Sequence, residues 1–189
     1  MLALVLLAAT PLAKAGGFGL LGTGGIHSDR LYYYQENAIG EYTQMAPIDQ
    51  LNPNAGGGFE LIVGDKDYKI NGMFRLYYEL DWPVVAPTGD FTYNLRTAEG
   101  RHVGVLDVGL QFGAIGEPES LQGVVVGLIG AGFLTSDQTE FAQAQTGIGG
   151  TYTIDRHLQF HAEITGGIRY RKRVFPMASG TAGVRYLFD

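Results

Sequence analysis

The chain of 189 residues contains no cysteine, which excludes disulfide bonds, thiolate metal sites and cysteine nucleophiles. Charged residues make up only 17% of the sequence, compared with roughly 25% in ordinary soluble domains. There is no excess of basic residues, because the formal net charge is −6, so general binding to nucleic acid is not expected. No apolar run reaches the roughly 20 residues that a membrane-spanning helix needs, and the longest candidate, 123–134, is interrupted by glycines.

Glycine and aromatic residues are abundant instead. The sequence holds 29 glycines, and aromatic residues account for 12% of it. Glycine in a helix interior costs about 1 kcal/mol relative to alanine, so this composition disfavours helices. It favours many closely packed strands, and we therefore expect an all-β fold.

Residues 1–15 have the pattern of a secretory signal peptide. An apolar run over 2–9 is followed by Pro11 and by the small-residue pattern Ala13-Lys14-Ala15, which is typical of a cleavage site. The alternative is a buried strand or helix at the N-terminus. We expect a signal peptide over 1–15 and one β domain over 16–189.

Strict alternation of polar and apolar residues marks the best strands. In 157–172 and in 68–82, one face is apolar and the other is polar and charged, as the two faces of a pleated strand allow. The full set of expected strands is 16–28, 56–64, 68–82, 101–116, 121–135, 141–155, 157–172 and 180–189. Long connections (29–55 and 83–100) alternate with short ones, which predicts an eight-stranded antiparallel up-and-down barrel.

Two features predict that the apolar faces point outward, into lipid. Eight strands leave an interior only just wide enough for side chains, and filling it with rings from every strand would overcrowd it. The aromatic residues also gather at strand ends, as two girdles at the membrane interfaces would require. Near the long connections these residues are Tyr78, Trp82, Phe133, Phe141 and Tyr170. Near the short turns they are Tyr68, Phe112, Tyr152, Phe160, Tyr186 and Phe188.

The polar faces then line a narrow lumen. Buried charges are tolerated only when they are paired and hydrogen-bonded, so we expect an ion-pair network there. Its predicted members are Arg75, Glu79, Asp81, Asp107, His161, Glu163, Arg169 and Arg185. Which acid meets which base depends on the shear of the barrel, which the sequence does not give.

The last strand, GVRYLFD (183–189), resembles the terminal strand of bacterial outer-membrane proteins, which alternates apolar residues and finishes in an aromatic residue. Together with the signal and the strand layout, the chain resembles small barrels of the OmpA/OmpX type. Here an aspartate follows Phe188, whereas those proteins usually end on the aromatic residue itself. The resemblance implies a bacterial outer-membrane location, contact with outer-membrane lipids, delivery to the barrel-assembly machinery through this strand, and no cofactor.

Two other sets of residues have patterns that can carry chemistry. Gly17, Gly19 and Gly22 match the dinucleotide pattern G-x-G-x-x-G but lie within a strand pattern, where that motif does not work. His157, His161 and Glu163 share one strand face, and we expect a structural role for them rather than a metal or acid–base site. No catalytic, metal or cofactor residue is therefore expected.

The expected function is non-enzymatic, namely envelope stability or interactions through the loops 29–55 and 83–100. One alternative is a lipid-modifying outer-membrane enzyme that depends on His157 or His161. Another is a soluble secreted barrel that holds a small apolar ligand in a cavity lined by Phe74, Leu76, Leu110 and Ile164.

Overall fold

A computed structural model describes residues 16–31, 34–36, 38–44, 48–64, 69–82, 101–134, 139–171 and 173–188. All regular elements in these ranges are strands, and none of them contains a helix long and apolar enough to cross a membrane. The expected signal peptide (1–15) and the expected loop 83–100 lie outside the described residues.

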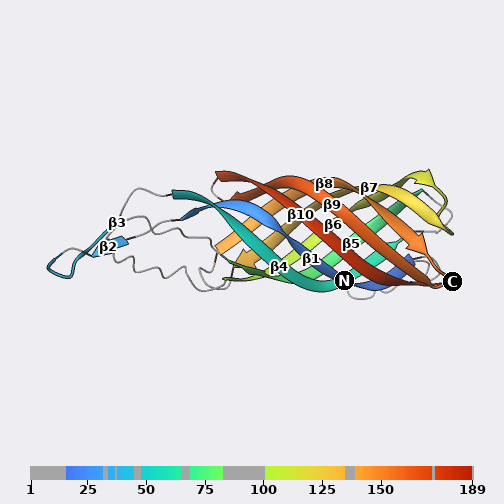
Figure 1. Cartoon of the computed structure of the whole chain (residues 1–189), viewed down its shortest axis with the longest axis horizontal. Coiled ribbons are helices and arrows are strands. Elements are labelled where there is room, and N and C mark those ends of the chain that lie inside the picture. The colour runs from blue at the N-terminus through green and yellow to red at the C-terminus, as the bar shows by residue number, and fades with distance from the viewer. Residues whose placement is uncertain are drawn as a thin grey trace, which may run out of the picture.

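Eight strands form one closed barrel, which confirms the predicted fold class (Figure 1). The ring order is β1-β10-β9-β8-β7-β6-β5-β4, and every neighbouring pair is antiparallel. The barrel strands are β1 (Gly16–Leu31), β4 (Ile48–Val63), β5 (Ile70–Asp81), β6 (Arg101–Gly116), β7 (Leu121–Leu134), β8 (Thr139–Thr153), β9 (Leu158–Arg171) and β10 (Arg173–Phe188). A separate two-stranded sheet pairs β2 (Tyr34–Glu36) with β3 (Tyr42–Gln44).

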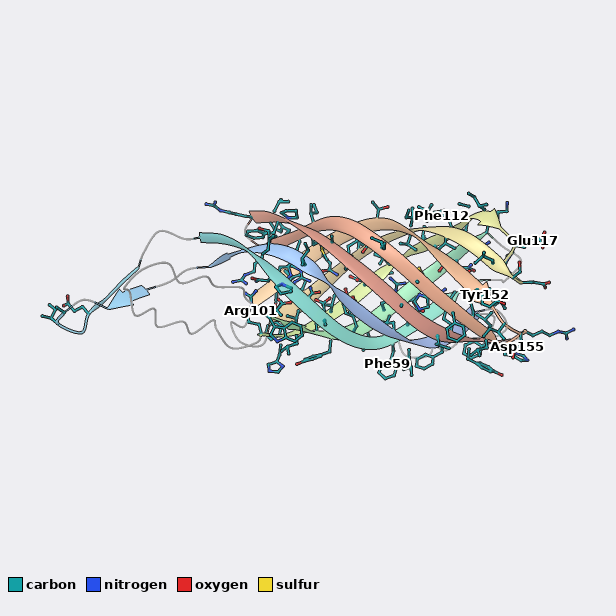
Figure 2. All side chains as sticks on the ribbon, viewed as in Figure 1. Phe59, Arg101, Phe112, Glu117, Tyr152 and Asp155 are labelled. Atoms are coloured by element: carbon teal, nitrogen blue, oxygen red, sulfur yellow. The ribbon has the colours of Figure 1, made fainter. Side chains whose placement is uncertain are left out.

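The barrel has two distinct ends. At the turn end the chain passes through 117–120 and 154–157, and Glu117 and Asp155 mark this end in Figure 2. At the loop end, marked by Arg101, β5 leads toward β6 and the β2–β3 sheet projects beyond the barrel (Figures 1 and 2).

The expected loop 29–55 is largely folded as strands, which corrects the predicted ends of the first two strands. β1 and β4 stay paired from Gly16 opposite Val63 up to Leu31 opposite Ile48. β10 pairs with β1 only as far as Met177 opposite His27, so the β1–β4 hairpin rises beyond its neighbours at the loop end. The sequence hid this extension because Pro53 is typical of a loop.

The last strand also begins earlier than predicted, at Arg173 rather than at residue 180, so 173–179 belongs to the strand. Proline lacks a ladder donor and is confined to positions where one side of a strand is unpaired. Pro176 lies just past the point where β1 stops pairing with β10, and Pro53 lies just past the Asn54–Asp81 pair of β4 and β5. Both prolines therefore occur where a barrel strand loses one neighbour near the loop end.

Two turns at the turn end are fixed by local chemistry. Gly116 has a φ of 85°, a left-handed value that glycine adopts without strain, and it leads into the turn 117–120. In the turn 154–157, Asp155 Oδ1 accepts hydrogen bonds from the backbone amides of His157 and Leu158, each at 2.8 Å. These two hydrogen bonds favour the carboxylate and lower the pKa of Asp155.

Candidate functional site: a polar lumen braced by ion pairs

The alternation of the strands places polar side chains inside the barrel and apolar ones outside. On β5, Arg75, Tyr77 and Glu79 are buried, whereas Phe74 and Leu76 on the same strand are exposed. More polar and charged residues than apolar residues are buried in the described part of the chain. The inner wall therefore has the chemistry that a protein surface normally has, and the outer wall has that of a core.

All eight residues predicted for the lumen network are buried on inward-facing positions of β5, β6, β9 and β10. Figure 2 shows the inward side chains filling the space between the ribbons. Together with their buried partners, the eight residues form two groups at different heights along the barrel axis. The first group is centred on Glu60, and the second lies nearer the loop end.

Glu60 of β4 is the centre of the first group and is 1% exposed. Its carboxylate accepts hydrogen bonds from Arg185 Nε at 2.5 Å and from Arg75 Nε at 3.2 Å. His161 Nε2 lies 2.7 Å from the same carboxylate. Glu163 completes the group, because Arg75 Nη2 donates to it at 2.6 Å. Two glutamates thus balance two arginines, with the imidazole between the acids.

The second group, nearer the loop end, contains three carboxylates. Asp107 accepts hydrogen bonds from the hydroxyl of Tyr77 at 2.7 Å and from Gln143 Nε2 at 2.8 Å. Arg169 Nη2 donates to Glu79 at 3.3 Å. The third carboxylate, Asp81, lies 3.4 Å from His27 Nε2 and 3.5 Å from Arg101 Nη2.

Three contacts cross the whole lumen. Strands four positions apart in a ring of eight lie on opposite walls, as do β5 and β9, and β6 and β10. Arg75 to Glu163 and Arg169 to Glu79 join β5 to β9, and Arg185 Nη1 to Gln111 Oε1, at 3.0 Å, joins β10 to β6. The interior is therefore braced from wall to wall by side chains of both groups.

Inward glycines make room for these side chains. Gly183 is paired with His161, and Gly149 is paired with Glu163. A Cβ added at Gly183 would collide with the His161 imidazole, and one added at Gly149 would press on the Glu163 side chain. On the inner wall, these two glycines are thus paired with residues that have larger polar side chains.

The sequence reasoning missed Glu60, although its carboxylate lies against the guanidinium groups of Arg75 and Arg185 and the imidazole of His161. The signal was present: Phe59 and Leu61 are exposed on either side of it, so alternation alone would have pointed Glu60 inward. The buried polar residues outside the predicted network are His27, Asn52, Asn54, Arg101, Gln111, Gln122, Gln143, Gln145, Thr151, Gln159 and Thr165.

The girdle residues within the described ranges are exposed on the outer wall, with one correction. The exposed girdle residues are Tyr78, Trp82, Phe112, Phe133, Tyr152, Phe160, Tyr170 and Tyr186, and Phe188 is partly exposed. Phe141 is 4% exposed and points inward, because it shares the parity of the inward Gln143 on β8. The guanidinium of Arg169 lies 4.1 Å from the centre of its ring, a cation–π contact. Tyr68 lies outside the described residues.

The candidate chemical motifs are accounted for by structural contacts. His157 stacks on Tyr186 at the turn end, with ring centres 5.4 Å apart, while His161 lies among the acids of the lumen. The described residues contain no group of three histidine, cysteine or acidic residues that could hold a metal ion. The G-x-G-x-x-G pattern lies inside β1, without the strand-to-helix turn that the nucleotide motif requires.

The cavity expected of a soluble barrel is contradicted by the structure. Ile164, Leu76, Leu110 and Phe74 are exposed on the outer wall, with between 71% and 44% of each residue accessible. They cannot line an interior cavity, because the alternation of each strand points these four side chains outward. Beside the inward face of β9, the hydroxyl of Ser179 lies 2.7 Å from Thr165 Oγ1 and donates to Gln145 Oε1 at 3.1 Å.

These observations define the class of the protein: a closed, eight-stranded antiparallel β-barrel with a charged interior and an apolar exterior. No protein-family model matches the chain. No curated protein sequence matches it either. Among solved structures, the chain is similar to the crystal structure of Neisserial surface protein A (NspA), with a TM-score of 0.44 and 11% sequence identity. That alignment covers 90% of this chain and 97% of the other.

Proposed function

We propose that this protein is a bacterial outer-membrane barrel that serves the envelope through its structure or through interactions at its loop end. The observation that carries the proposal is the inverted distribution of polarity. Apolar residues face outward on all eight strands, while arginine, glutamate and aspartate side chains are buried and paired inside. A lipid bilayer is the environment that makes this distribution stable, since a closed barrel satisfies every backbone polar group internally.

The bracing of the lumen supports a role other than solute passage. Eight strands leave no wide channel, and here the remaining space is crossed by Arg75–Glu163 and Arg169–Glu79 contacts between opposite walls. A solute would have to break buried ion pairs at two heights of the barrel. Function is then expected at the ends, where the β1–β4 hairpin and the β2–β3 sheet project beyond the barrel wall (Figure 1).

Electrophoretic heat modifiability tests the proposal. The denatured chain is refolded with and without detergent micelles, and the migration of unboiled and boiled samples is compared. We expect a β-rich form that appears only with micelles and migrates differently when it is not boiled. A water-soluble β form without such a shift would refute the membrane location.

The orientation can be tested because the chain has no cysteine of its own. Gly40→Cys places a thiol between β2 and β3, and Ser120→Cys places a matched thiol in a turn at the opposite end. A membrane-impermeant maleimide applied to intact cells is expected to label the first variant and not the second. Labelling of the second alone would place the loop end on the inner side of the membrane and contradict its role as the exposed surface.

A further inference from the structure

The outer wall carries a groove toward the loop end, across β5 to β9. Its central row consists of five residues, each paired in register with the next on the neighbouring strand: Leu76, Leu106, Ala131, Ala142 and Tyr170. The groove has a volume of about 650 Å³. That size lies within the roughly 300–1,000 Å³ of small-molecule sites.

Small residues form the floor of the groove. Ala131 and Ala142 lie side by side on neighbouring strands, and a Cβ added at Gly104 would have no atom within 4 Å. Phe133 and Tyr170 stand above this floor and are 42% and 55% exposed. The result is an apolar channel on the outer wall with aromatic sides, a shape suited to a hydrocarbon chain.

Charged residues lie where the groove reaches the loop end. Arg171 lines the groove and is paired in register with Arg173 of β10, which is exposed, while Lys172 links the two strands in the sequence. Glu140 also lines the groove, on β8. Its carboxylate would repel an anion, so a negatively charged group is favoured over the β9–β10 tip rather than over β8.

We propose that this groove binds one membrane lipid, with an acyl chain over Ala131 and Ala142 and a headgroup phosphate at Arg171 and Arg173. Guanidinium groups hold phosphate through charge-assisted hydrogen bonds, and basic residues beside an apolar surface select anionic lipids. The site rests on the proposed membrane location. It adds a defined lipid chemistry and a defined position on the wall.

A second copy of the chain is the competing occupant, and the charges argue against it. A symmetric pair of barrels in one membrane uses the same surface patch on both copies. In such a pair centred on the groove, the β9 side of one copy would lie against the β5 side of the other, so the two Arg171–Arg173 tips would lie on opposite flanks of the contact. A lipid phosphate would neutralise the basic tip directly, whereas the tip of a second copy would not.

The test uses the full chain refolded in dodecyl maltoside micelles and titrated with diphosphoryl lipid A or with the same lipid stripped of phosphate. Native mass spectrometry measures bound lipid and subunit number. We expect one lipid per monomer, and binding of the phosphorylated form that is about 10- to 30-fold tighter, the effect of two basic residues near a headgroup.

Four variants make the result specific. Arg171→Gln with Arg173→Gln should abolish the preference for phosphate, and Glu140→Gln should strengthen binding of the phosphorylated form. Gly104→Leu with Ala131→Leu should fill the groove and abolish binding of both lipids. The matched control, Gly22→Leu with Ala182→Leu, changes outward small residues paired on β1 and β10 and should bind as the wild type does.

Three outcomes would overturn the lipid site: no bound lipid, equal binding of both lipid forms, or a dimer that replaces the lipid adduct. Heat modifiability of each sample distinguishes the possible failures. If the chain forms no micelle-dependent barrel, the proposed function itself is refuted. If a well-formed barrel binds no lipid, only the lipid site is refuted.

Discussion

Removing the carboxylate of Glu60 is the sharpest test of the braced lumen. Glu60 is buried, accepts hydrogen bonds from Arg75 and Arg185, and lies beside His161. Glu60→Ala would leave two guanidinium groups sharing the single carboxylate of Glu163. Breaking a buried ion pair by deleting one partner costs about 3–5 kcal/mol, so we expect a loss of unfolding free energy of that size.

Urea unfolding in micelles measures this loss, with the fluorescence of Trp82, the single tryptophan, and gel migration as two independent readouts. With a slope of roughly 1–3 kcal/mol per molar urea, the midpoint should fall by at least about 1 M. Glu60→Gln keeps an acceptor oxygen but not the charge, and its loss should be smaller. Glu117→Ala, an exposed acid at the turn end, is the control and should change stability by less than about 0.5 kcal/mol.

A double variant separates the ion pair from simple loss of volume. Replacing a buried pair by apolar residues is often neutral or stabilising, so Glu60→Met with Arg185→Met should cost less than the two single changes added together. The reasoning is refuted if Glu60→Ala behaves like Glu117→Ala. Strict additivity of the methionine changes would also refute it.

Three further predictions address the walls and a turn. Gly183→Val should cost about 1–3 kcal/mol in the same assay because its side chain would collide with the His161 imidazole, whereas Gly104→Ala, which faces open space, should be nearly neutral. Ile164→Arg should cost about 2–4 kcal/mol if this outward residue, 71% exposed, lies in the bilayer core, and unchanged stability would contradict the lipid contact. Asp155→Asn should lower the urea midpoint at pH 7. Folding lowers the pKa of Asp155, so the stability that its carboxylate contributes is present above about pH 4 and is lost as the pH falls through the lowered pKa. The urea midpoints of wild type and variant should therefore converge in acid. A difference that stays constant with pH would contradict this prediction.

Much of the barrel could be predicted from alternation alone, because each strand has one face in a polar interior and one outside. This rule placed Arg75 and Glu163 on the inside and Phe74 and Ile164 on the other face. It failed where neither face carries a signal. On β7, Val124 and Val126 point inward beside outward Val125, so polarity could not show the register there.

The network could be predicted as a set of residues but not as a set of pairs. Arg75 meets Glu163 across the barrel, 88 positions away in the sequence, and that contact depends on the stagger of strands around the ring. The alternating pattern at Glu60 is short, because the three glycines before Phe59 carry no side chains that could extend it, and Glu60 was therefore missed. Phe141 was misplaced because its position near a strand end was given more weight than its parity with Gln143.

The pairing of β1 with β10 has a consequence for how the molecule assembles. This seam joins Gly16 to Phe188, so it cannot form until both strands are present, and each partial sheet before that has two unpaired edges. In hydrocarbon every unsatisfied amide or carbonyl along such an edge costs several kcal/mol, and in water the same edge invites aggregation. Folding by gradual addition of strands within a bilayer is therefore disfavoured. The chain needs an environment, or another protein, that shelters the two edges until they meet.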